Sequence, residues 1–451
     1  MSGDAPTRVR HARVSPAQRL AGLRNNTLLR RAAMVASGAA AGQLILAAAS
    51  PILSRWFDPE AFGLLGAFLG VATLLGTCGA FRLELAIQAA DTDDEADDVA
   101  VLALRTAFVV ALLAAVVIIA LAVGRGSTDS MLWLVPPTAL AITAFNTGVF
   151  RSIRAGHFTS VARARLLLGI GTVVPQLLAG ALGAGAFGLL IGPLIGWGAA
   201  ALILLGRAGV QPTRSLTESG ATLLKRHRRF PLFSVWSGLF NRGALEVPAV
   251  LLLAFFDQRA AGLFYLCNRV LVVPANVVAD GLYQSFLNQA GELARTDAAG
   301  LHRRTRNLVG SLAIAVVVPV GIGMLVVPPL LPVVFGAAWE DAGPLALRLL
   351  PMVATLVIAV PVSSQLWLLG RQDLELLRDA GRFVAVVAVF VTANAADWTL
   401  TRTVTAYSIV MGLAYLTTAG LALWVTARHR VPTAPAVDEA AARTGEVPSR
   451  G

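Results

Sequence analysis

The chain of 451 residues is 56% hydrophobic and only 14% charged, which excludes an ordinary soluble domain and predicts a multi-pass membrane protein. Its formal net charge of +11 would also suit a nucleic-acid-binding protein, but arginines that flank membrane helices give the same balance. The positions of the basic residues therefore decide between these two interpretations.

Residues 1–31 are basic and hold no apolar run of about 20 residues, so they predict a cytoplasmic lead-in rather than a span or a cleavable signal peptide. After them, apolar runs long enough to cross a bilayer recur along the chain. They predict spans at 32–54, 62–86, 101–124, 131–150, 166–183, 187–205, 231–256, 262–286, 308–328, 346–369, 382–396 and 402–426. The eleventh of these twelve runs is the shortest.

Basic residues gather in the even-numbered connections between these spans and are sparse in the odd-numbered ones. The even-numbered connections hold Arg151, Arg154, Arg163, Arg165, Arg207, Arg214, Lys225, Arg226, Arg228, Arg229, Arg295, Arg303, Arg304, Arg306, Arg371 and Arg378. Because basic connections stay on the cytoplasmic side, both termini are predicted there. The basic connection 207–230 predicts a linker between two six-span halves, 32–206 and 231–426, and the tail 427–451 is predicted to be disordered.

The two halves share a short motif. WFDPEAFGLL at 56–65 and FFDQRAAGLF at 255–264 have Phe, Asp and Gly at a constant offset, each in the turn after the first span of its half. Asp58 and Asp257 are expected to cap the helices that follow. We therefore predict an all-α membrane protein of about twelve helices, in two six-helix lobes related by a pseudo-two-fold axis along the membrane normal.

The seventh and eighth spans carry ionisable residues within apolar sequence. Charged groups are costly there and normally face a protein interior or a watery cavity. Arg242 and Glu246 are four residues apart and share one helical face, with Asn241 beside them. They are either an internally neutralised pair that joins helices or part of a transport path.

A polar stripe is predicted along the eighth span. Arg269, which follows Asn268, and Asp280 are eleven residues apart, about three helical turns, with Gln284 one turn further on. Pro274 is expected to kink the helix between them. These side chains predict a cavity wall, with a place near the membrane interface as the alternative for Asp280 and Gln284.

Three further polar residues complete the candidate set. Gln43, in the first span, is a single amide that either joins helices or lines the cavity. Arg82 and Glu84 end the second span on its cytoplasmic side, where they either belong to a gate or extend to the membrane interface.

The chain resembles Wzx-like oligosaccharide flippases. In that family a Pro-Glu-x-Phe-Gly turn is followed by Arg-x-Glu-x-Ala-Ile at the inner end of the second span. The matching residues here are Pro59, Glu60, Phe62, Gly63, Arg82, Glu84, Ala86 and Ile87. Residues 240–278 resemble the family's seventh and eighth spans, and residues 335–351 resemble its outer segment before the tenth span.

The resemblance implies the fold and alternating access of the multidrug/oligosaccharidyl-lipid/polysaccharide exporters. It also implies export of a polyprenyl-diphosphate-linked oligosaccharide from the inner to the outer leaflet of a bacterial plasma membrane. Arg242 and Arg269 would then bind the diphosphate. Membrane lipids and polysaccharide assembly proteins are the expected partners, not nucleic acid. No cofactor is expected, and the membrane potential or a cation gradient would drive export.

Four alternatives remain. A drug or cation exporter of the same fold would use Glu246 and Asp280, whereas the related peptidoglycan-precursor flippase usually has two additional spans. A membrane polymerase or glycosyltransferase would need a large outer loop, but the longest outer connection, 327–344, is only about eighteen residues. A scaffold without transport activity would leave the intramembrane charges unexplained. The sequence contains no P-loop and no Ser/His/Asp constellation, so we expect neither an ATP-driven motor nor an enzyme.

Overall fold

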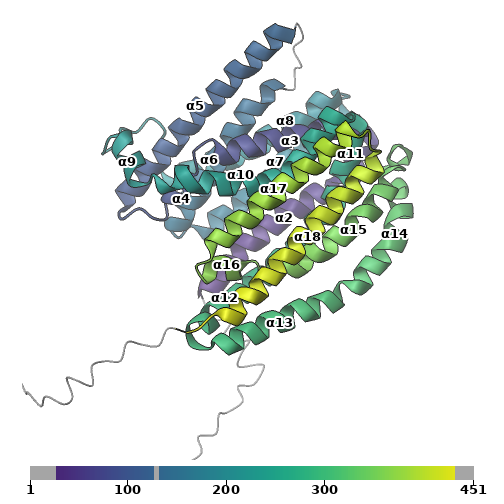
Figure 1. Ribbon diagram of the computed structural model, residues 1–451. Coiled ribbons are helices and arrows are strands. Elements are labelled where there is room, and N and C mark those ends of the chain that lie inside the picture. The colour runs from purple at the N-terminus through teal and green to yellow at the C-terminus, as the bar shows by residue number, and fades with distance from the viewer. Residues whose placement is uncertain (1–26, 126–131, 432–451) are drawn as a thin grey trace, which may run out of the picture.

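The structure is a computed structural model that describes residues 27–125 and 132–431, and these residues form a bundle of helices (Figure 1). The long helices are α2 (Thr27–Trp56), α3 (Pro59–Cys78), α5 (Asp93–Arg125), α6 (Val135–Arg154), α7 (Phe158–Ala181), α8 (Gly185–Ala208), α10 (Val235–Phe255), α11 (Gln258–Cys267), α12 (Val273–Thr296), α13 (Ala298–Ala315), α14 (Val317–Phe335), α15 (Ala342–Ala359), α17 (Gln372–Ala395) and α18 (Leu400–Arg428). The short ones are α4 (Leu83–Ala86), α9 (Gly220–Arg226), α16 (Ser364–Leu368), the π-helices η2 (Phe230–Ser234) and η3 (Asn268–Val272), and the 3₁₀ turns η1 (Leu132–Leu134), η4 (Ala337–Trp339) and η5 (Val360–Val362). Most of the predicted basic lead-in and of the predicted tail lie outside the described residues.

Within the described ranges, eleven helical segments are long and apolar enough to cross a membrane. They correspond to eleven of the twelve predicted spans. The exception is α17, which has 24 residues but carries five charged residues in its first half. It packs against α10 and α18, in the place of the predicted eleventh span. The predicted all-helical membrane fold is confirmed.

The predicted boundaries are least accurate around the ninth span. It was expected at 308–328, but helix runs from Ala298 to Phe335 with one break at Val316. The outer connection expected at 327–344 is therefore mostly helix. In lipid a backbone carbonyl has no water to bond, so an apolar segment gains by remaining helical up to its end.

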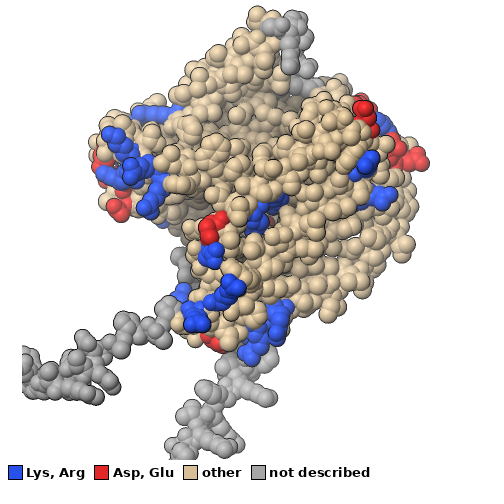
Figure 2. Space-filling view, viewed as in Figure 1, with Lys and Arg blue, Asp and Glu red and all other residues tan. Residues whose placement is uncertain are grey.

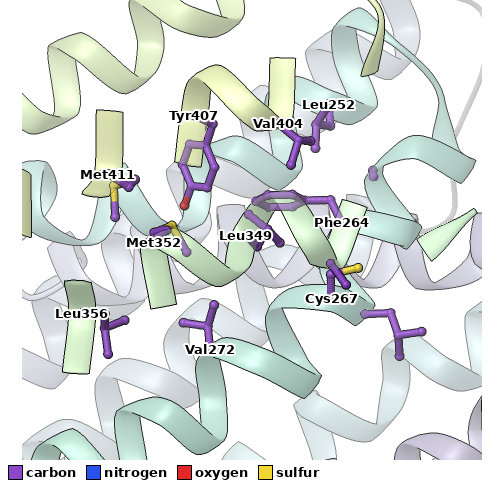
Figure 3. Packing of buried hydrophobic residues seen from close by; sticks show 14 of the residues in the cluster. Leu252, Phe264, Cys267, Val272, Leu349, Met352, Leu356, Val404, Tyr407 and Met411 are labelled. Atoms are coloured by element: carbon purple, nitrogen blue, oxygen red, sulfur yellow. The ribbon is translucent and has the colours of Figure 1, made fainter. Parts of the chain in front are cut away.

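Helices α2 to α8 and helices α10 to α18 form two lobes, which are joined mainly by the packing of α3 against α10 and α11 (Figure 1). We call them the N-lobe and the C-lobe. In the C-lobe core, Phe264 of α11 meets Tyr407 of α18 edge to face, with ring centroids 5.5 Å apart (Figure 3). Cys267, one turn after Phe264, is fully buried beside α15, where its thiol donates to the Ala342 carbonyl. This dense apolar packing gives α11 a fixed position at the lobe boundary.

The linker between the lobes is bound to the start of α5. Arg214 pairs with Asp97 at 3.0 Å, and Arg226 of α9 pairs with Glu95 at 2.8 Å. Figure 2 shows arginine and lysine gathered around α9 and around the α12–α13 turn. We call this end of the bundle the basic end.

Asp58 and Asp257 mark the other end. The Asp58 side chain accepts from the Ala61 backbone N–H at 2.8 Å, and Asp257 accepts from the Ala260 N–H at 2.6 Å. Both predicted caps are confirmed. Each cap begins a helix that faces the other lobe, α3 in the N-lobe and α11 in the C-lobe. We call this end the closed end.

The lobes touch backbone to backbone where α3 crosses α11. A Cβ atom on Gly63 would lie 1.9 Å from the carbonyl oxygen of Gln258, and one on Gly262 would lie 1.7 Å from that of Pro59. The contact is reciprocal, because Pro59 and Gln258 each begin the helix that contains one of the glycines. Glycine is required at both positions, since any side chain would force the helices apart.

Side chains from both lobes surround this crossing. Arg259 pairs with Asp341 at 2.9 Å within the C-lobe and reaches Glu60 of the N-lobe at 3.7 Å. The buried Trp339 donates its indole N–H to the Ser54 carbonyl of α2 at 3.2 Å. Polar and backbone contacts thus join the lobes at the closed end.

We expect Gly262→Ala to separate the lobes at the closed end, because its methyl group would overlap the Pro59 carbonyl. In a background without the two native cysteines, cysteines at positions 60 and 259 should crosslink efficiently, and the crosslinked fraction should fall several-fold in Gly262→Ala. Gly281→Ala is the control, since its Cβ would meet no atom within 4 Å. Equal crosslinking in all three proteins would contradict the close crossing.

Candidate functional site

One face of α10 runs along the boundary between the lobes. A Cβ on Gly238 would lie 3.3 Å from Arg82 Nε of the N-lobe, and a Cβ on Gly70 of α3 would lie 2.9 Å from the Glu246 carbonyl. Arg242 lies between these two contacts on the same helical face, since the positions 238, 242 and 246 are four apart. Its side chain is 49% exposed, so the guanidinium group faces an accessible part of the boundary.

Arg242 and Glu246 form a loose pair. The distance from Arg242 Nη1 to Glu246 Oε1 is 4.0 Å, and the Glu246 side chain is 27% exposed. Among the described residues, no other carboxylate lies as near to this arginine. A guanidinium group has five N–H donors, so a pair of this length leaves most of them available to an anionic ligand.

Arg269, predicted to line a cavity, is instead buried against the N-lobe. Its side chain lies in η3, is only 7% exposed, and donates to the Leu46 carbonyl of α2 at 2.6 Å. Tyr265, one turn earlier, lies close enough to interact with it. A guanidinium group removed from water needs an acceptor, and the backbone of the other lobe provides one. Arg269 becomes accessible only if α2 moves away.

A second pair of charges connects the lobes nearer the basic end. Asp280 of α12 is exposed and interacts electrostatically with Arg165 of α7. Arg165 was placed in a connection by the sequence analysis, but α7 begins at Phe158 and carries it into the bundle. Its buried Nε has no hydrogen-bond partner in the described part of the chain. Arg269 and Asp280 therefore both face N-lobe helices.

The other predicted cavity residues are less central. Asn268 donates to the Phe264 carbonyl of its own helix at 3.3 Å, so its amide is used locally. Gln284 is half-buried on α12, and Gln43 is exposed on α2, one turn before the carbonyl that Arg269 contacts. The irregularity expected at Pro274 is the π-helical segment η3, which ends two residues before it.

A buried ion network on α17 was missed. Asp379 is 1% exposed, accepts from Arg378 at 3.0 Å and from the Asn241 amide at 3.2 Å, and pairs with Arg382 at 3.5 Å. Arg382 also donates to the Asn241 carbonyl at 3.2 Å. The sequence analysis began the eleventh span at 382 and assigned the preceding residues to a connection. The spacing of Glu375, Asp379 and Arg382 by four and three residues could have indicated a helix.

Arg82 and Glu84 form a strained corner at the basic end. Phe81 and Arg82 have φ values of +48° and +59°, which cost roughly 1–3 kcal/mol each outside glycine. This corner turns α4 into the lobe, so Glu84 is 2% exposed and the membrane-interface alternative is wrong for it. Burial raises the pKa of the Glu84 carboxyl, although Arg82, 3.4 Å away, opposes that shift.

The boundary therefore holds arginines whose partners differ in strength. Arg269 is held by a backbone carbonyl, and Arg242 has only a distant carboxylate. Among the described residues no cluster of His, Cys, Asp or Glu could hold a metal ion. This arrangement can bind an anion between the lobes and can link its binding to their separation.

Comparison with known proteins places this sequence in a family. A family model described as "Polysaccharide biosynthesis protein" matches residues 52–344. No curated protein matches the sequence.

Several solved structures share the fold. An inward-facing multidrug resistance MATE family transporter of the MOP superfamily has 16% identity, covers 85% of this chain and 94% of its own, and gives a TM-score of 0.65. The lipid II flippase MurJ in an inward closed conformation has 10% identity, covers 86% and 88%, and gives 0.66. A MOP superfamily transporter from Pyrococcus furiosus, described as having a binding pocket of reversed polarity, has 15% identity, covers 88% and 95%, and gives 0.56. These matches confirm the predicted two-lobe exporter fold.

We expect Asp379→Asn to destabilise the protein by about 3 kcal/mol or more, because it leaves the buried Arg382 without a carboxylate and Arg378 with only Glu375, 3.8 Å away. Asp373→Asn is the matched control on the same helix, since Asp373 is 62% exposed and its pair with Arg371 is worth at most about 1 kcal/mol. Chemical unfolding of the purified variants in detergent would measure both changes. Equal losses of stability would contradict a buried network at Asp379.

Proposed function

Because the chain belongs to the polysaccharide biosynthesis protein family, we propose that it moves a polyprenyl-diphosphate-linked oligosaccharide across the membrane by alternating access between its lobes. The observation that carries this proposal is the half-exposed Arg242 at the lobe boundary. A diphosphate presents neighbouring anionic oxygens, and a planar guanidinium group binds such oxygens through two parallel hydrogen bonds. The distant Glu246 competes only weakly for the same donors.

Arg269 would act in another part of the transport cycle. Its contact with the Leu46 carbonyl is intact while α2 and η3 are together. Separation of the lobes would break this contact and expose a second guanidinium group. A diphosphate could then replace the carbonyl as the acceptor. Arg242 would bind the substrate first, and Arg269 would hold it once the lobes have moved.

The orientation of the chain supports outward movement. The arginine-rich connections would lie in the cytoplasm, so the closed end would face outward and the structure would represent a state that receives substrate from inside. Moving a headgroup with about two negative charges outward is favoured by an inside-negative potential, roughly 2.3 kcal/mol per charge per 100 mV. We propose this potential as the driving force in a bacterial plasma membrane, without a bound cofactor.

A cation or drug exporter of the same fold is the second candidate. The observation that favours it is the 27% exposure of Glu246, whose carboxylate could bind a cation when Arg242 turns away. The two functions differ in which residue of the pair is essential. Glu246→Gln should abolish cation export but should largely preserve movement of a diphosphate.

We expect Arg242→Gln to lower export about tenfold or more, because a charge-assisted hydrogen bond to phosphate is worth roughly 1.5–3 kcal/mol. Deletion of the gene should cause a polyprenyl-linked glycan to accumulate in membrane extracts, protected from an added glycosidase. The intact gene and an Arg228→Gln control, changed at an exposed linker residue, should remove the accumulation, whereas Arg242→Gln should not.

Two results would contradict this proposal. Full complementation by Arg242→Gln would remove the diphosphate site from the boundary. Deletion that causes no glycan accumulation but new sensitivity to cationic compounds would favour the second candidate and transfer the binding role to Glu246.

A further inference from the structure

A pocket of about 600 Å³ lies between α12 and α13 at the basic end. Its volume is within the range of about 300–1,000 Å³ that is usual for small-ligand sites. Six polar side chains from the two helices line it, and Phe286 and Leu308 provide apolar surface. The polar residues are Ser285 and Gln289 from α12 and Arg303, Arg304, Asn307 and Ser311 from α13. The pocket therefore combines two cations with an apolar floor.

The pocket is separate from the lobe boundary. On α12, Asp280 faces the N-lobe through Arg165, whereas Ser285 and Gln289 line the pocket. At about 100° per residue, these two positions are roughly 140° and 180° around the helix from Asp280. One face of α12 is thus directed at the N-lobe and the opposite face lines the pocket. The pocket does not share residues with the proposed transport site.

The two arginines carry uncompensated charge. In the described part of the chain, neither Arg303 nor Arg304 has a carboxylate within ion-pair distance, and no acidic residue lines the pocket. Arg304 donates to the Gln289 side-chain oxygen at 3.1 Å, which fixes the position of its guanidinium group. By contrast, Arg242, Arg82 and Arg378 all have carboxylate partners. The pocket is therefore suited to an anionic ligand.

The order of polar and apolar residues along α13 favours an anion that carries a hydrocarbon chain. Asn307, Ser311 and Ile314 succeed one another by four and three residues, so the pocket wall continues directly into an apolar stripe. Ile314 is 77% exposed, and Val318 beyond the break is 66% exposed. On a membrane-spanning segment such side chains face the lipid chains.

We propose that the α12–α13 pocket binds the phosphate of an anionic membrane lipid, with Arg303 and Arg304 at the headgroup and the acyl chain along Ile314 and Val318. The two arginines lie in the first two turns after the basic-end connection, which is the depth of a headgroup. This site holds the lipid independently of whether the transported substrate is a glycan or a cation.

Native mass spectrometry of the purified full-length protein tests this proposal. Phosphatidylglycerol should bind with one tight site, and phosphatidylcholine should bind at least tenfold more weakly. Arg303→Gln with Arg304→Gln should weaken phosphatidylglycerol binding at least tenfold. Arg306→Gln is the matched control, because it removes the same charge from an exposed position on the same helix that does not line the pocket.

Two further variants separate headgroup, chain and folding effects. Asn307→Trp would fill the pocket with both arginines intact and should also remove the tight site. Ile314→Ser should weaken lipid binding without changing the binding of inorganic phosphate, since only the lipid has a chain. Equal binding of inorganic phosphate and phosphatidylglycerol would overturn the lipid assignment, and unchanged lipid binding in the double arginine variant or in Asn307→Trp would overturn the site.

Discussion

The close crossing of α3 and α11 is the constraint on which the rest of the arrangement depends. Gly63 and Gly262 let the two backbones touch, and no other residue type fits either position. The contact joins the lobes at the closed end, and further along the boundary α10 meets Gly70 of α3 at Glu246 and the Arg82 side chain at Gly238. The crossing lies within an apolar contact, because Phe62 of α3 packs against Tyr265 and Trp339 of the C-lobe, and the two glycines set how closely the lobes approach.

The charges near the boundary follow from this geometry. Where the lobes meet, a buried guanidinium group must find an acceptor on the other lobe or within its own. Arg269 bonds a carbonyl of α2, and Asp379 holds Arg378 and Arg382 within the C-lobe. Arg242 is left with the weakest partner and the largest exposure. The same physics distinguishes the structural arginines at the boundary from Arg242, whose guanidinium group can take a ligand there.

The sequence was sufficient for the fold and for part of the site. The length of the apolar runs predicted eleven segments that the structure also contains. The side-chain type at the helix starts predicted the caps at Asp58 and Asp257. It was insufficient where a partner is distant in the chain. Asp379 meets Asn241, 138 residues away, and Arg269 meets a backbone carbonyl, which has no sequence signature. The start of α17 was misjudged because its charges, neutralised by one another, looked like a connection.

The central claim is that this chain moves an anionic lipid-linked glycan past Arg242. Reconstituted vesicles that carry a fluorescent polyprenyl-diphosphate oligosaccharide, with a membrane-impermeant quencher outside, would measure its movement between leaflets. The account predicts movement that requires the protein, accelerates when the imposed potential drives negative charge toward the destination leaflet, and is lost in Arg242→Gln. Vesicles in which the lipid stays in its original leaflet while a cationic dye is transported would contradict it.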